Sequence, residues 1–162
     1  MYAFPEACSA VAINPAELAN ALYRPSYISM HWALGYYGLI PEKVVTYTSV
    51  TSRVTRHFDN SFGSFRYHSI KLAAFFGYAV LAIAGQKVVI AEPEKALLDF
   101  WYFEEGKWDV KRMAEMRFQN TEMIDTDKLH KYAEKYRSPR IIKAVELWGS
   151  VISSQSEGTV EL

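Results

Sequence analysis

The chain has 162 residues, and its 18 basic and 18 acidic side chains give a formal net charge of zero. This balance argues against a small domain that overall positive charge holds on nucleic acid or on an anionic membrane. Half of the residues are hydrophobic and only 22% are charged, which excludes a disordered, charge-rich tail and suits one globular domain.

The cysteine content and the apolar runs indicate a compartment. The chain holds one cysteine, Cys8, so no intrachain disulfide can form, as fits a reducing cytoplasm. We find no signal-peptide pattern, and the longest apolar run, residues 72–84, is too short to span a bilayer. We therefore expect a cytoplasmic protein without a membrane partner.

The beginning of the chain predicts two helices. Asn14 can cap the first helix, Pro15 suits its first turn, and Pro25 ends it. Ser29 can cap the second helix, for which Gly38 is placed as a left-handed terminator.

From residue 44 the pattern changes to the alternation and β-branched content that are typical of strands. The Asp59-Asn60-Ser61 sequence predicts the turn of one β-hairpin, and Gly85-Gln86 predicts the turn of a second. We expect a small, mostly antiparallel sheet of about five strands at residues 44–50, 54–58, 62–69, 77–84 and 87–91.

The C-terminal half is predicted to be helical. Glu92-Pro93-Glu94 opens a helix in which residues 96–103 are apolar almost all round, apart from Asp99, so this helix should be central and covered. Shorter helices are expected at 109–118, 127–136 and 139–152, followed by a flexible tail at 153–162. The whole chain, 1–162, thus reads as one α+β domain with helices flanking the sheet.

Few residues point to catalysis. The four histidines lack metal-ligand spacing, and neither a glycine-rich phosphate loop nor a Gly-x-Ser-x-Gly motif is present, so we expect no catalytic, cofactor or metal site. Asp99 stands four residues after Lys95 and can form a local ion pair. The alternative is an enzyme, a divergent nucleotidyltransferase or nuclease, in which Asp99 meets Glu92 or Glu94 in a cleft.

The charge distribution is more informative than its total. Residues 43–71 hold five bases against one acid, and residues 107–143 hold ten bases against six acids, so each zone carries a net charge of +4. Alternation in the first zone places Arg66 and His68 on one sheet face, which could meet phosphates or an acidic protein. The alternative is a solvated hairpin whose charges protect a sheet edge. Our candidate DNA- or partner-binding residues are Arg53, Arg56, Arg66, His68 and Lys71.

Several of these segments, in this order, resemble one known family. The segments are Pro25-Ser26-Tyr27-Ile28-Ser29, Tyr37-Gly38-Leu39-Ile40-Pro41, Thr48-Ser49-Val50-Thr51, Phe62-Gly63-Ser64-Phe65-Arg66-Tyr67 and Ala91-Glu92-Pro93-Glu94-Lys95-Ala96-Leu97-Leu98-Asp99. Together they resemble the AbiEi antitoxins of type IV toxin–antitoxin systems, which act in abortive infection, a phage defence. The similarity covers roughly residues 15–105 strongly and the helical remainder more loosely.

The resemblance implies a non-enzymatic function. Members of the family join an N-terminal winged helix-turn-helix to a C-terminal domain of this kind, act as transcriptional regulators of their own operon, and counter a nucleotidyltransferase-like toxin, without requiring a stable complex. We therefore expect the C-terminal domain of such an antitoxin, without the winged helix, with residues 1–13 as a remnant of the interdomain connection. An accessory DNA-binding or dimerisation domain of a transcription regulator is the other non-enzymatic alternative.

Overall fold

The structure, a computed structural model, describes residues 13–161, with side chains up to residue 154. Cys8 and nearly all of the expected interdomain connection at 1–13 lie outside the described residues. The predicted α+β fold is confirmed: a six-stranded mixed, mostly antiparallel sheet is flanked by helices, and the C-terminal half is helical.

The sheet has the strand order β3-β4-β2-β1-β6-β5. Both predicted hairpins are present: β3 (Arg56–Asn60) pairs antiparallel with β4 (Gly63–Ser69), and β5 (Tyr78–Ile83) pairs antiparallel with β6 (Gln86–Ala91). The strand β2 (Tyr47–Thr51) lies parallel to β4, and it starts three residues later than the sequence predicts. The two hairpins therefore form the two edges of the sheet.

A strand that the sequence analysis missed joins the two halves of the sheet. This strand, β1 (Ser26–Ile28), runs antiparallel to β2 and parallel to β6, with Ile28 opposite Ile90. Because β1 has only three residues, the amide of Asn20 takes over part of its role: it donates to the carbonyl of Val89 at 3.0 Å and accepts from its N–H at 2.7 Å. A buried side chain thus satisfies a strand backbone that no neighbouring strand reaches.

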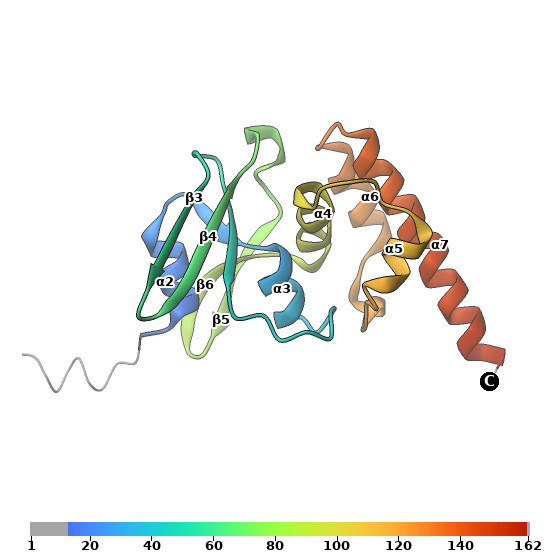
Figure 1. The fold of residues 1–162 in the computed structure, drawn as a ribbon, viewed down its shortest axis with the longest axis horizontal. Coiled ribbons are helices and arrows are strands. Elements are labelled where there is room, and N and C mark those ends of the chain that lie inside the picture. The colour runs from blue at the N-terminus through green and yellow to red at the C-terminus, as the bar shows by residue number, and fades with distance from the viewer. Residues whose placement is uncertain (1–12, 162) are drawn as a thin grey trace, which may run out of the picture.

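The helices form layers on both sides of the sheet (Figure 1). The helix α2 (Pro15–Leu22), capped by Asn14, covers one face, while α3 (Met30–Tyr36) and α4 (Pro93–Phe103) lie on the other. Beyond α4, on the side away from the sheet, lie α5 (Val110–Glu115), α6 (Thr126–Glu134) and α7 (Pro139–Glu161). Two short 3-10 helices, Leu72–Ala74 and Thr121–Met123, occupy connections. The helix α4 is therefore the central layer.

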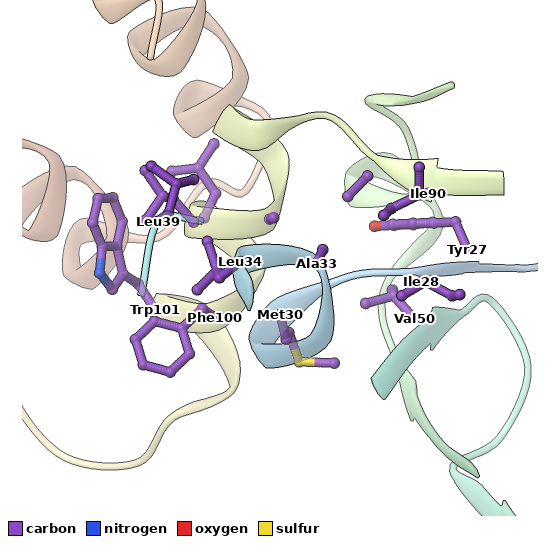
Figure 2. Close-up of a cluster of buried hydrophobic side chains, with 14 of the residues drawn as sticks. Tyr27, Ile28, Met30, Ala33, Leu34, Leu39, Val50, Ile90, Phe100 and Trp101 are labelled. Carbon is purple, nitrogen blue, oxygen red and sulfur yellow. The ribbon is translucent and has the colours of Figure 1, made fainter. Parts of the chain in front are cut away.

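The sequence of α4 explains this central place. All residues from Glu94 to Trp101 are buried, as the apolar pattern predicts. Figure 2 shows Phe100 and Trp101 of α4 beside Leu34 and Leu39, with Tyr27, Ile28, Val50 and Ile90 grouped on the strands. One continuous core thus extends from the sheet through α3 and α4 into the helical half.

The ends of two helices can be compared with the sequence predictions. The helix α7 continues to Glu161, where the sequence predicts a flexible tail from residue 153; the segment holds no proline, so its backbone can continue the helix. Gly38 has a φ of +73°, as its predicted role of terminator requires.

Within the described residues, we find no helix whose length and apolar character would allow it to cross a membrane.

Candidate functional site

Two of the five candidate basic residues, Arg53 and Arg56, lie around one buried ring. The guanidinium carbon of Arg53 is 4.3 Å from the centroid of the Tyr23 ring, and that of Arg56 is 5.6 Å from it and 4.8 Å from the Phe58 centroid. We call these two residues the arginine pair. The contacts are cation–π interactions, which hold a cation on the surface without neutralising it.

The local structure explains why the arginine pair is ordered. Tyr23 is only 3% exposed, and its hydroxyl donates to the carbonyl of Val54 at 3.0 Å, which fixes the ring under the loop between β2 and β3. Arg53 donates from its side chain to the carbonyl of Arg24 at 3.1 Å, and its backbone N–H donates to the hydroxyl of Thr51. Both arginine side chains remain exposed.

The other candidates on the hairpin lie on the opposite face of the sheet. Arg56 stands opposite Tyr67 in the β3–β4 register, and Tyr67 faces α2, where its hydroxyl donates to the carbonyl of Ala19 at 2.5 Å. Since neighbours along a strand point to opposite faces, Arg66 and His68 face away from α2. These two residues share one face as predicted, and the arginine pair is not part of it.

His68 is a poor candidate for a surface cation. Its ring is half-buried, with its centroid 5.1 Å from that of Phe103 in α4. Burial, and then the charge of Arg66, lower the pKa of His68. The ring is therefore a neutral packing group near pH 7, at the contact between the sheet and α4.

Lys71 is only partly available for binding. Its ammonium group donates to the backbone carbonyl of Tyr136, the second residue after α6, and thereby connects the end of β4 with the helical half. Lys71 is exposed, like Arg53, Arg56 and Arg66, but its ammonium group already donates to a backbone carbonyl.

Arg53, Arg56 and Arg66 form no ion pair with an acid among the described residues. The ion pairs among the described side chains involve Lys95, Lys128 and His31, with Asp99, Glu92, Glu94 and Glu104, and no arginine takes part in them. An exposed guanidinium without a carboxylate can make bidentate bonds to a phosphate or to an acidic side chain of another molecule. The arginine pair, in contact with the Tyr23 ring, is therefore the candidate anion-binding feature of the first basic zone.

The acids considered for catalysis do not form a common site. Asp99 is fully buried and accepts four hydrogen bonds: from Lys95 at 2.5 Å, from Tyr136 at 2.5 Å, from Ser29 at 2.7 Å and from Tyr27 at 2.9 Å. The predicted ion pair between Lys95 and Asp99 is thus confirmed. With its acceptor positions filled, this carboxylate has no free oxygen for a metal or a substrate.

The buried cluster shifts the protonation equilibria of its members. Burial lowers the pKa of Lys95, although the Asp99 carboxylate opposes this effect. The pKa values of Tyr27 and Tyr136 lie well above the ordinary value, first because of burial and then because of Asp99. Both tyrosines are therefore neutral hydrogen-bond donors at any physiological pH.

Glu92 and Glu94 belong to a different set of contacts. Glu92 accepts from the Lys128 ammonium at 2.8 Å and from the Tyr132 hydroxyl at 2.6 Å, while Glu94 accepts from the backbone N–H of Asp125 at 2.9 Å. The hydrogen bond to Glu92 raises the pKa of Lys128. These acids fasten α6 to the start of α4, and no hydrogen bond or ion pair among the described residues joins them to Asp99.

Sequence reasoning missed the hydroxyl partners of Asp99. It assigned Ser29 to helix capping, but the Ser29 hydroxyl makes no capping bond and donates to Asp99 across 70 positions of sequence. Tyr27 and Tyr136 gave no signal either, because a tyrosine on an apolar face looks like ordinary core. Only the polar residue inside the apolar helix, Asp99, marked the place where such donors must converge.

No metal centre is formed by the described residues, since no group of three or more His, Cys, Asp or Glu side chains could hold an ion. Comparisons of the chain with protein-family models, with curated proteins and with solved structures found no match.

Proposed function

We propose that this chain is an antitoxin-type regulatory domain that counters a nucleotidyltransferase-like toxin without being an enzyme. The observation that supports this best is the arginine pair, two ordered and exposed guanidinium groups without a described acidic partner. Its setting within segments similar to those of AbiEi antitoxins supports the same proposal.

The proposed mechanism is recognition of an anionic surface. Tyr23 and Phe58 hold Arg53 and Arg56 against the sheet, so little side-chain freedom is lost when the guanidinium groups bind. The partner is either nucleic acid, through its phosphates, or an acidic surface of the toxin. Arg66, on the opposite face, provides a separate cationic position.

Co-expression with the neighbouring toxin gene tests the proposal. Wild-type chain should restore the growth of cells that express the toxin, and the double variant Arg53→Glu/Arg56→Glu should lose at least about tenfold of this rescue, since each reversed charge repels the anionic partner. The matched control, Lys111→Glu/Lys143→Glu, makes the same charge change at two exposed positions of the helical half and should still rescue.

Two outcomes would contradict this proposal. Failure of the wild-type chain to rescue growth would reject an antitoxin function, and equal loss with both double variants would reject the arginine pair as the contact. A DNA titration of the same proteins distinguishes nucleic acid from a protein partner. If the arginine pair contacts phosphates, the charge-reversed double variant should show a plot of log affinity against log salt concentration that is less steep by about two.

The enzyme alternative loses its structural basis. It required Asp99 to meet Glu92 or Glu94 in a cleft, whereas Asp99 is buried under four donors, and Glu92 and Glu94 bind α6. This arrangement supports a non-enzymatic function, and the accessory DNA-binding domain is the alternative that the titration tests.

A further inference from the structure

The outer edge of β5 differs from the other edge of the sheet. At the β3 edge, Arg56, His57 and Asp59 are exposed, and such charges protect an edge from pairing with other chains. The β5 edge, Tyr78–Ile83, carries no charged residue, and no strand of the described residues pairs with its outer side.

Apolar side chains are exposed along this edge. Tyr78 is 43% exposed and Val80 is 58% exposed, and Ala82 continues the same row. The three residues share the face that carries Tyr27, because the Tyr78 ring stacks on the Tyr27 ring with centroids 5.0 Å apart. An uncharged, apolar edge with free backbone groups is a template for strand addition.

A groove extends this apolar surface toward α2. It has a volume of about 690 Å³, and Phe75, Tyr78 and Val89 line it together with Leu18 of α2. Within the groove the hydroxyl of Ser26 is buried and has no hydrogen-bond partner among the described residues. The surface around β5 is therefore suited to contact with another polypeptide.

We propose that β5 pairs antiparallel with β5 of a second copy of this chain about a two-fold axis that passes beside Val80, so that Val80 faces Val80 of the other copy and the sheet is continuous across a homodimer. Charge favours this occupant: an acidic or basic strand would find no counter-charge on Tyr78–Ile83, whereas a copy of the same strand brings no charge to it. A two-fold interface also needs a self-complementary patch, which an apolar strand provides.

The two-fold axis requires the antiparallel arrangement, and the position of Lys87 is compatible with it. Lys87 is the one charged residue of the hairpin 78–91, and it lies opposite Ala82, near one end of β5. Antiparallel pairing about the two-fold axis places the two Lys87 residues at opposite ends of the interface, so their like charges stay far apart. The proposal does not rest on the antitoxin function, and its test has a different readout.

Sedimentation equilibrium of the full chain tests the dimer. We expect a monomer–dimer equilibrium at micromolar concentrations, and we expect Val80→Lys to weaken it at least about tenfold, because two ammonium groups would be placed side by side at the interface. The control Val45→Lys introduces the same charge at a 75% exposed valine outside the sheet and should leave the equilibrium unchanged. Far-UV circular dichroism checks that both variants fold.

Cysteine cross-linking adds an independent readout. In a Cys8→Ser background, Val80→Cys should form a disulfide-linked dimer under mild oxidation, whereas Val45→Cys should form no such covalent link. A wild-type chain that is monomeric at all concentrations overturns the proposal and assigns the edge to another protein or to the residues ahead of Ile13. Equal weakening by both lysine variants also overturns it.

Discussion

At the scale of single residues, the cluster around Asp99 shows how one polar residue in an apolar helix is accommodated. A carboxylate without partners would be very costly at this depth, so the fold brings one ammonium group and three hydroxyl groups to it. The donors come from β1, from the residue after β1, from α4 itself and from the second residue after α6. The cluster therefore supplies hydrogen bonds to the buried carboxylate and also fixes how β1, α4 and the segment after α6 pack together.

Removing the charge of Asp99 should be strongly destabilising. Asp99→Asn leaves the Lys95 ammonium group buried without a counter-charge, and we expect the free energy of unfolding to fall by about 3–5 kcal/mol. The control Asp59→Asn changes an exposed acid with a single hydrogen bond to Ser64 and should cost less than about 1 kcal/mol. Urea unfolding of both variants measures the difference, and equal losses would contradict a structural role for the buried pair.

The sequence could predict only part of this cluster. Lys95 and Asp99 are four positions apart in one helix, and this spacing was sufficient to predict their ion pair. Tyr27 and Ser29 reach Asp99 from positions about 70 residues away, and such contacts depend on the topology of the sheet. Local patterns contain no information on that topology.

At the scale of secondary-structure elements, the start of β5 fits closely against α4. Gly77 precedes β5 with a φ of +77°, and a Cβ atom at this position would lie 3.0–3.1 Å from three side-chain carbons of Lys95. Gly85, in the turn between β5 and β6, has a similar φ of +80°, but a Cβ atom there would meet nothing within 4 Å. The two glycines share a backbone conformation and differ in their surroundings.

This difference yields a paired prediction. Gly85→Ala should cost about 1 kcal/mol, because alanine disfavours a positive φ, and Gly77→Ala should cost about 1–3 kcal/mol more, because its methyl group also displaces the stem of Lys95. Thermal or urea unfolding of the two variants gives the comparison. If the two alanine variants are equally stable, the contact between Gly77 and Lys95 has no energetic weight.

The sequence pattern could predict the two hairpins but not the short strand β1. The hairpins were predictable because Asp59-Asn60-Ser61 and Gly85-Gln86 carry turn signals close to the observed turns at residues 61–62 and 84–85. The strand β1 was missed because three buried residues after Pro25 cannot show an alternation. The sequence also could not predict that β5 lies at an edge, since the strand order of the sheet depends on the position of β1. A short strand thus determined which hairpin became which edge.

At the scale of the whole molecule, a few polar and aromatic contacts join the sheet to the helical half. The Lys71 ammonium group donates to the carbonyl of Tyr136, and the ring of His68 lies beside Phe103. Around His68, the charged groups that influence it are Arg66, His31 and Glu104. Protonation of His68 would place a charge in this contact.

We therefore expect a pH dependence of stability at this contact. The pKa of His68 is lower in the folded chain than the ordinary 6.5, so near pH 6 the unfolded chain binds more protons and stability rises with pH. Lowering the pH from about 7.5 to about 5.5 should reduce the free energy of unfolding, and His68→Gln should diminish this slope. The control His57→Gln, at an exposed ring, should keep the wild-type slope.

The sequence could predict which segments of the chain are basic, but it could not predict where their side chains lie on the folded molecule. The first basic zone is present, yet its members are separated: the arginine pair faces α2, Arg66 faces away from α2, and Lys71 binds the helical half. Strand alternation could place Arg66 with His68, but the side of the sheet on which Arg53 lies depends on its contacts with Tyr23 and Arg24. Long-range packing decided which cations are available.

The contacts of Tyr136 indicate where the smallest part of the chain that can fold on its own ends. Its hydroxyl bonds to Lys95 and Asp99, and its carbonyl accepts from Lys71, so the one residue closes contacts to α4 and to the end of β4. A chain shortened to the sheet and α4 would contain every strand and still leave two ammonium groups without these acceptors. The minimal domain boundary therefore lies beyond Tyr136, far outside the segment that carries the β-structure.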